Sequence, residues 1–101
     1  MLIYNVTTKI SWEMHEAWVA WMKETHLPEV MATGCFTDMR FVRLLETDET
    51  EGPTYAAQFH AENDEQYRKY INDYAPAIRQ DVVNNWGSHF ISFRSLMEVV
   101  N

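Results

Sequence analysis

Strand-like and helix-like segments follow one another in this chain in the order β-α-β-β-α-β, and no other feature limits the possible folds as strongly. Residues 2–9 are rich in β-branched and aromatic side chains, which is typical of a strand. Residues 35–46 and 54–61 are similar and flank a short acidic turn that ends in Gly-Pro, so they predict an antiparallel hairpin. Residues 89–100 form the fourth predicted strand.

The first predicted helix begins after Ser11, a suitable N-cap residue. Large apolar side chains recur in it at helical spacing, at Met14, Trp18 and Met22, with Trp21 beside them and with Thr25 or His26 next. Pro28 cannot donate a hydrogen bond to the preceding turn, so we expect a kink or a restart near Leu27. A short second piece over residues 29–32 should then end at Gly34, a residue type suited to helix C-termini.

The second predicted helix begins with a capping-box pattern, Asn63 followed by Gln66. Its apolar stripe contains Tyr67, Tyr70, Ile71, Tyr74 and Ile78 and resumes with Val82 and Trp86. Pro76 interrupts this helix as Pro28 interrupts the first, and Gly87 ends it. The order therefore predicts an α+β fold, the ferredoxin-like sandwich, in which a four-stranded antiparallel sheet packs against two helices. We expect residues 1–101 to form a single domain.

Charge and cysteine content exclude several functions. The net charge is −7 and the eight Lys and Arg residues are not clustered, which argues against binding to nucleic acid or to an anionic membrane. Cys35 is the only cysteine, and no His has a second ligand at metal-binding spacing, so we predict no metal site and no cofactor. The chain does not begin like a signal peptide, and we expect it in the cytoplasm.

Large apolar residues on both faces of the predicted sheet indicate a homodimer. In the last strand, one face has Ile91, Phe93, Met97 and Val99, and the other has Phe90, Leu96 and Val100. In the second strand, Met39, Phe41 and Leu45 alternate with Phe36, Val42 and Leu44. Helices can cover only one face, so a second copy is the simplest cover for the other. The alternative is a monomer with scattered surface hydrophobic residues.

The sequence resembles an uncharacterised bacterial family of short proteins, a domain of unknown function. The resemblance covers nearly the whole chain and rests on residues 4–7 (Tyr-Asn-Val-Thr), 18–22 (Trp-Val-Ala-Trp-Met), 26–30 (His-Leu-Pro-Glu-Val) and 34–36 (Gly-Cys-Phe). The chain also resembles, more distantly, the dimeric α+β barrel superfamily of antibiotic-biosynthesis-type monooxygenases, ethyl-tert-butyl-ether-degradation-type proteins and haem-degrading enzymes. That resemblance implies a dimer whose sheets face each other and a pocket between sheet and helices.

The haem-degrading relatives hold iron with a His on the second helix, helped by an Asn on the first strand and a Trp on the second helix. Asn5 and Trp86 are similar to the latter two residues, but no His lies between Asn63 and Trp86. The usual iron ligand is missing, so the resemblance does not extend to haem.

His26 is the strongest candidate for catalysis, because imidazole exchanges protons near neutral pH. The competing interpretation, which we favour, is a structural histidine bonded to helix carbonyls or to a strand. Further candidates are residues that would line an apolar ligand pocket: Asn5, Tyr67, Tyr70, Tyr74, Trp18 and Met22. For the aromatic residues, core packing is the simpler explanation.

Three hypotheses for function follow. The first is a homodimeric module that binds a small apolar or aromatic molecule. The second is a cofactor-independent, monooxygenase-like enzyme that acts on a phenol or quinol with His26 as base, by analogy with the superfamily. The third is a protein-interaction or regulatory domain.

Overall fold

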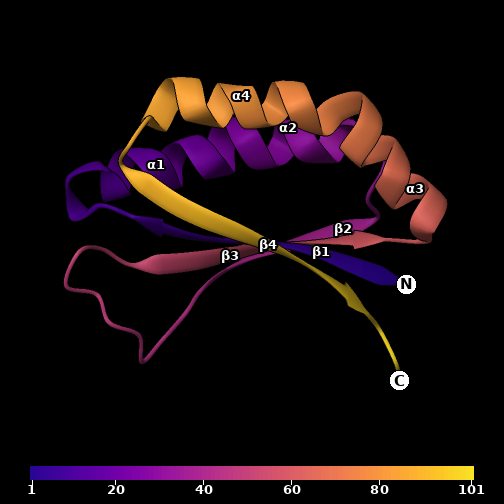
Figure 1. Cartoon of the computed structure of the whole chain (residues 1–101), viewed down its shortest axis with the longest axis horizontal. Helices are drawn as coiled ribbons and strands as arrows, with labels where there is room; N and C mark the ends of the chain where they lie inside the picture. The colour runs from indigo at the N-terminus through magenta and orange to yellow at the C-terminus, as the bar shows by residue number, and fades with distance from the viewer.

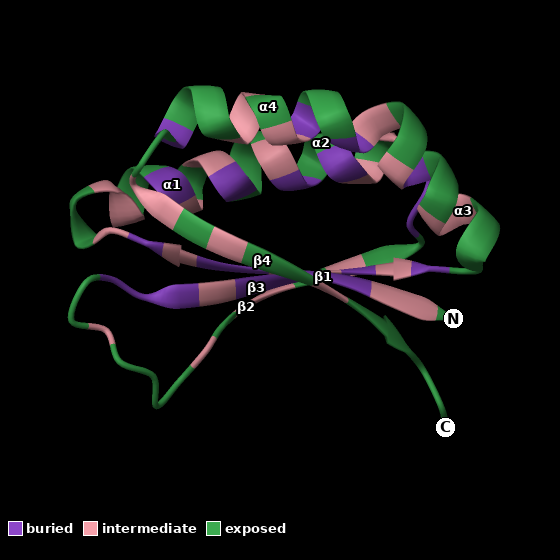
Figure 2. Ribbon diagram, in the orientation of Figure 1, coloured by how far each residue is buried: buried purple, intermediate pink, exposed green.

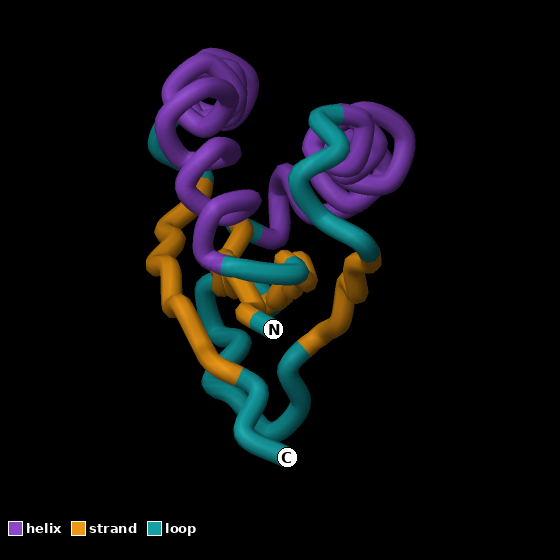
Figure 3. The backbone as a smooth tube through the Cα atoms, turned by 90° about the vertical axis from the view of Figure 1, so that its right-hand side faces the viewer, coloured by secondary structure: helices purple, strands orange, loops and turns teal.

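The structure, a computed structural model, describes all 101 residues and contains one antiparallel sheet covered on one face by helices (Figure 1). The strands are β1 (Leu2–Ile10), β2 (Asp38–Arg43), β3 (Thr54–Ala61) and β4 (Phe90–Glu98), in the spatial order β2-β3-β1-β4. The view along the sheet shows both helical segments on the same side (Figure 3). This arrangement confirms the predicted ferredoxin-like fold.

Each helical segment is longer than a single α-helix. The first contains a 3₁₀ turn (Trp12–Met14), α1 (His15–Trp21), a π turn (Met22–His26) and α2 (Leu27–Ala32). The second contains α3 (Asp64–Lys69), a π turn (Tyr70–Tyr74) and α4 (Ala75–Trp86). Asn63 caps α3 as predicted, because its side-chain oxygen accepts a hydrogen bond from the Gln66 backbone at 2.9 Å. No helix is long and apolar enough to cross a membrane.

The first helix is interrupted where expected, since α2 begins at Leu27, but the interruption at each proline is a widened π turn and not a break in the helix. At the end of each π turn a backbone N–H donates to the carbonyl five residues earlier. Leu27 donates to Met22 in the first segment, and Ala75 donates to Tyr70 in the second. Proline follows at the next position in both segments. Because proline has no N–H and its ring crowds the carbonyl four residues earlier, one extra residue in the turn relieves the conflict.

The extra residue rotates the rest of each helix by about 100° relative to a regular helix. The buried series therefore steps from Met22 to Leu27 and from Tyr70 to Ala75, all of which are at most 6% exposed. Tyr74, which a regular helix would place on the buried stripe, is only partly buried. The predicted stripe is otherwise confirmed after the π turn, because Ile78 and Trp86 are 7% and 9% exposed and Val82 packs against the same core.

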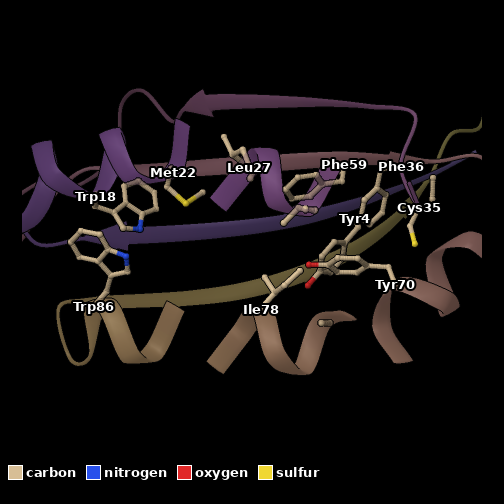
Figure 4. Close-up of a cluster of buried hydrophobic side chains, with 14 of the residues drawn as sticks. Tyr4, Trp18, Met22, Leu27, Cys35, Phe36, Phe59, Tyr70, Ile78 and Trp86 are labelled. Atoms are coloured by element: carbon tan, nitrogen blue, oxygen red, sulfur yellow. The ribbon is translucent and has the colours of Figure 1, made fainter. Parts of the chain in front are cut away.

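Tyr4, in the middle of β1, lies at the centre of an aromatic cluster between sheet and helices (Figure 4). Its ring centroid lies 5.7 Å from that of Tyr70 and 6.2 Å from those of Phe36 and Phe59. Phe36 precedes β2 and is 5% exposed, so it belongs to this core and not to a sheet face as predicted. Offset and tilted rings at these distances stabilise the core beyond simple burial.

The strand register separates the two faces of the sheet. Tyr4 faces the helices, so its neighbours Asn5 and Thr7 lie on the opposite face. On that open face β4 contributes three large apolar side chains, Ile91, Phe93 and Met97, which are 74%, 61% and 37% exposed. Much of β4 is accordingly coloured as exposed (Figure 2). The predicted two-faced apolar pattern of this strand is confirmed.

The acidic turn between β2 and β3 is fastened to the end of β1. The Trp12 indole N–H donates to the Glu49 carbonyl oxygen at 2.7 Å, and the Arg43 guanidinium pairs with the Glu49 carboxylate at 2.9 Å. The Ile10 backbone N–H donates to the Pro53 carbonyl oxygen at 3.1 Å. This contact brings Gly52 against the backbone of Ile10, with no room for a side chain.

Candidate functional site

A cavity of about 110 Å³ lies between the helices and the helix-facing side of β1 and β4. Its apolar walls are Val6, Phe59, Ile78, Val82, Val83 and Phe90. Its polar groups come from Tyr4, His26, Tyr70, Arg79, Ser92 and Arg94. Apolar walls with a few convergent polar groups are the usual composition of a small-molecule site.

A second hollow, of about 420 Å³, lies beside α2 and β2 and is more open to solvent. It is lined by Leu27, Pro28, Met31, Met39, Phe41 and Lys23. Lys23 is its only charged group, and it contains no cluster of hydrogen-bonding side chains that would fix the orientation of a ligand. The smaller cavity is therefore the better candidate.

His26 is placed at the cavity by the π turn. Its ring stacks on that of Trp21, five residues earlier, with centroids 5.0 Å apart and planes 26° apart. Residues five apart do not face each other on a regular α-helix, so the stacking depends on the widened turn. The imidazole has no hydrogen-bond partner within the chain, and the predicted bond to helix carbonyls or to a strand is absent.

Burial lowers the pKa of His26 from 6.5 to about 4, and the nearby Asp81 carboxylate opposes this shift only in part. The imidazole is therefore neutral at pH 7, with one N–H donor and one acceptor nitrogen. A neutral imidazole whose pKa is this low is a weak base, since general bases work best when their pKa lies near the working pH.

Tyr4 and Tyr70 present their hydroxyl groups to the cavity side by side near Ile78 (Figure 4). An Arg79 Nη donates to the Tyr4 hydroxyl at 3.2 Å. Burial, and secondarily the neighbouring Tyr4, raises the pKa of Tyr70, so its phenol stays protonated at neutral pH and can donate a hydrogen bond. Tyr70 has no hydrogen-bond partner within the chain.

Of the candidate residues from the sequence, the structure brings His26 and Tyr70 together at this cavity. Asn5 lies on the opposite face of the sheet, where its amide donates to the Thr7 hydroxyl at 2.9 Å. Trp18 and Met22 are core residues, 2% and 6% exposed. Two tyrosines also lie outside the cavity lining, Tyr67 and Tyr74.

Sequence reasoning missed two charged residues of the cavity, Arg79 and Arg94. Phe90, Ser92 and Arg94 are two residues apart in β4 and share its helix-facing side. The two-residue spacing can be read from the sequence, but it assigned no role to Arg94. Arg79 lies three residues before Val82 and seven before Trp86, so helical spacing places it beside the predicted stripe, but no role was predicted for its charge.

The cavity does not fit haem. Its volume lies below the roughly 300–1,000 Å³ of drug-sized ligand pockets. The helical segment from Asp64 to Trp86 contains no His, Cys or Met that could hold the iron. No group of three or more His, Cys, Asp or Glu residues lies close enough together to hold a metal ion.

Comparison with known proteins identifies a family and a shared fold. The family described as Domain of unknown function (DUF4286) matches residues 1–100. No curated protein matches the chain.

Several solved structures are similar over the whole chain. A haem degrader, MhuD from Mycobacterium tuberculosis with two haems bound, is 16% identical, with a TM-score of 0.71 over 100% of this chain and 97% of that one. A putative antibiotic biosynthesis monooxygenase from Nitrosomonas europaea is 8% identical, with a TM-score of 0.70 over 100% of both chains. A dimeric ferredoxin-like protein from an uncultured marine organism is 10% identical, with a TM-score of 0.71 over 100% of this chain and 96% of that one. At these identities the likeness concerns the fold alone.

Proposed function

The chain belongs to the DUF4286 family, a domain of unknown function, and we propose that it is a homodimeric module that binds a small aromatic molecule in the cavity beside His26. The observation that supports this function most directly is the state of His26 and Tyr70. Both reach the cavity, and neither has a hydrogen-bond partner within the chain. The buried polar atoms without a partner are Arg79 Nε and Trp86 Nε1, so His26 and Tyr70 still meet water in the cavity, and a bound oxygen or nitrogen atom would replace that water.

The size of the cavity limits the ligand. A cavity of about 150 Å³ is known to accept benzene, and this one measures about 110 Å³. The cavity is therefore smaller than one that encloses benzene, so the expected ligand is a single small ring that is only partly enclosed, with any substituent toward the exposed side of β4. The names of similar structures, a haem degrader and a putative antibiotic biosynthesis monooxygenase, agree with a fold that accommodates cyclic organic molecules.

A second candidate function, a cofactor-independent oxygenase for phenols or quinols with His26 as base, is supported by the position of His26 at the cavity. Its pKa of about 4 weighs against it, because the enzyme would need a stronger base at neutral pH. Replacement of His26 by Ala separates the two functions. We expect the variant to bind phenol more weakly, because the cavity loses a polar group, and both proteins to consume no oxygen with a quinol. Oxygen uptake that requires His26 would favour the enzyme.

Filling the cavity should prevent binding. We expect Ser92→Leu, which adds a branched side chain to the cavity wall, to raise the Kd for phenol at least tenfold, as measured by titration in ¹H–¹⁵N NMR spectra. Ser88→Leu is the matched control, because Ser88 is exposed in the turn before β4 and lies outside this cavity. Equal phenol affinity in both variants, or no binding by the unmodified protein, would contradict the proposed site.

The open face of the sheet supports the homodimer. Its exposed apolar side chains, Ile91, Phe93 and Met97, form a stripe along β4 that no part of the chain covers. A stripe of this kind is typical of an interface. The similar marine protein is named a dimeric ferredoxin-like protein, which favours a second copy as the cover.

A charge at the centre of this stripe should separate the subunits. We expect the protein to sediment as a dimer at micromolar concentration and Phe93→Asp to raise the dissociation constant at least tenfold, because a buried carboxylate would lack a partner. Leu45→Asp is the control, since Leu45 is an apolar residue even more exposed than Phe93 and follows the end of β2. A monomeric parent, or a Phe93→Asp variant that dimerises normally, would refute the interface.

A further inference from the structure

We propose that the natural ligand of the cavity is an anion, a small carboxylate with an apolar body, and that Arg79 and Arg94 bind its charged end. This inference rests on the proposed binding function and names the chemical class of the ligand. Three features of the cavity support it: two arginines that form no ion pair, an excess of hydrogen-bond donors, and apolar walls.

Both guanidinium groups lack a carboxylate partner. Only two ion pairs form in the chain, Arg43 with Glu49 and Arg68 with Asp64, although acidic residues outnumber Lys and Arg by 15 to 8. Two carboxylates lie close enough to act on groups of this cavity, Asp81 on His26 and Glu29 on Tyr70, but neither forms an ion pair with Arg79 or Arg94. Both guanidinium groups therefore remain available to an anionic ligand.

The Arg79 guanidinium is held by one hydrogen bond, but one of its other N–H groups has no acceptor. One Nη donates to the Tyr4 hydroxyl at 3.2 Å, and its Nε is shielded from water without any acceptor. Nε and Nη lie on one edge of the guanidinium plane, and such an edge matches the two oxygens of a carboxylate. Because Nε is shielded, a ligand oxygen would supply its missing acceptor only after a small shift of the Arg79 side chain toward the cavity.

The other polar groups of the cavity also favour an acceptor-rich ligand. The Tyr70 phenol is protonated at neutral pH and has no partner, and neutral His26 adds one more N–H. With the two guanidinium groups, hydrogen-bond donors outnumber acceptors in the cavity. A carboxylate offers acceptors only, so it satisfies these donors better than an amide or an alcohol of the same shape.

The apolar walls distinguish a carboxylate from a free inorganic anion. Eight of the twelve lining residues are hydrophobic, so most of the ligand surface inside the cavity should be apolar. Inorganic phosphate would place charge against Val6, Phe59 and Ile78 without gaining apolar burial. An aromatic or short aliphatic carboxylate places its body there and its charge at the arginines.

Two probes of nearly equal shape, benzoate and benzamide, test the inference. We expect the unmodified protein to bind benzoate at least tenfold more tightly than benzamide at low ionic strength, measured by NMR titration, and inorganic phosphate more weakly than benzoate. Arg79→Gln and Arg94→Gln should each reduce this preference several-fold and leave the affinity for benzamide nearly unchanged. Arg68→Gln is the control, because it removes the same charge from an exposed position.

Arg94→Gln keeps the test decisive if Arg79→Gln folds poorly, because Arg94 is exposed and its replacement disturbs no core contact. Equal affinities for benzoate and benzamide would overturn the inference while the proposed binding function stands. The same preference in all variants, or tighter binding of phosphate than of benzoate, would also overturn it. If no aromatic probe binds at all, the proposed function itself fails.

Discussion

Replacing Gly52 with alanine should destabilise the protein by about 3 kcal/mol, the largest loss that we expect from one added methyl group. A Cβ at this position would lie 1.8 Å from the carbonyl oxygen of Ile10 and 2.8 Å from its carbonyl carbon. Both are backbone atoms of β1, which is hydrogen-bonded on both sides and cannot retreat. The turn would have to move away, and the bond from the Ile10 N–H to the Pro53 carbonyl would break.

Gly34→Ala is the matched control for this prediction. Gly34 has φ of +76°, but an added Cβ would meet no atom within 4 Å. Its replacement should therefore cost only the strain of a left-handed residue, about 1 kcal/mol. Urea denaturation followed by circular dichroism measures both free energies of unfolding. A loss at Gly52 no greater than that at Gly34 would show that the turn yields easily and would refute the close approach.

Acidification should destabilise the protein through His26. The folded protein holds the pKa of His26 at about 4, whereas the unfolded chain has a value near 6.5. Between these pH values the unfolded chain binds a proton that the folded protein does not. The contribution of neutral His26 to the free energy of unfolding is therefore full above pH 6.5 and is lost as the pH falls toward 4. The change amounts to about 2–3 kcal/mol, somewhat less than full burial would give, because the ring keeps some contact with water.

Comparison with the His26→Gln variant separates the effect of His26 on stability at low pH from the effect of carboxylate protonation, which both proteins share. We expect the difference in unfolding free energy between the parent and the variant to shrink, or to reverse sign, by about 2–3 kcal/mol between pH 7.5 and pH 4. A direct NMR titration of the imidazole, with the variant used to assign its signal, should give a pKa far below 6.5. A difference that stays constant with pH, or an ordinary pKa, would contradict the burial of a neutral ring.

Much of the fold could be predicted because it depends on local patterns. The alternation in β1 and β4, the Asn63 cap and the glycines that follow the helices each follow from a few neighbouring residues. The consequences of the prolines could not be predicted in the same way. A proline within a helical pattern is compatible with a break, a kink or a widened turn, and the choice depends on whether the segment after it can still pack against the sheet.

The candidate site was predicted less completely than the fold, for the same reason. His26 and Tyr70 were identified from their residue types, and their meeting at one cavity depends on the two π turns. Asn5 was assigned to a pocket, although its neighbour Tyr4 already occupies the helix-facing side of β1. Arg79 and Arg94 come from elements far apart in the sequence, and their lack of carboxylate partners is a property of the tertiary structure alone.

The paired π turns also mark where the helical layer over the cavity is weakest. At each turn the following proline provides no N–H, so the helical hydrogen-bond ladder is weakest there, and segments bounded by weak points open locally at lower free energy than the whole domain. The part of α4 after Pro76 forms a wall of the cavity and can separate from it without loss of any bond in the sheet. Such local opening would widen the cavity and expose amides of α4 to hydrogen exchange, while those of β1 and β3 stay protected.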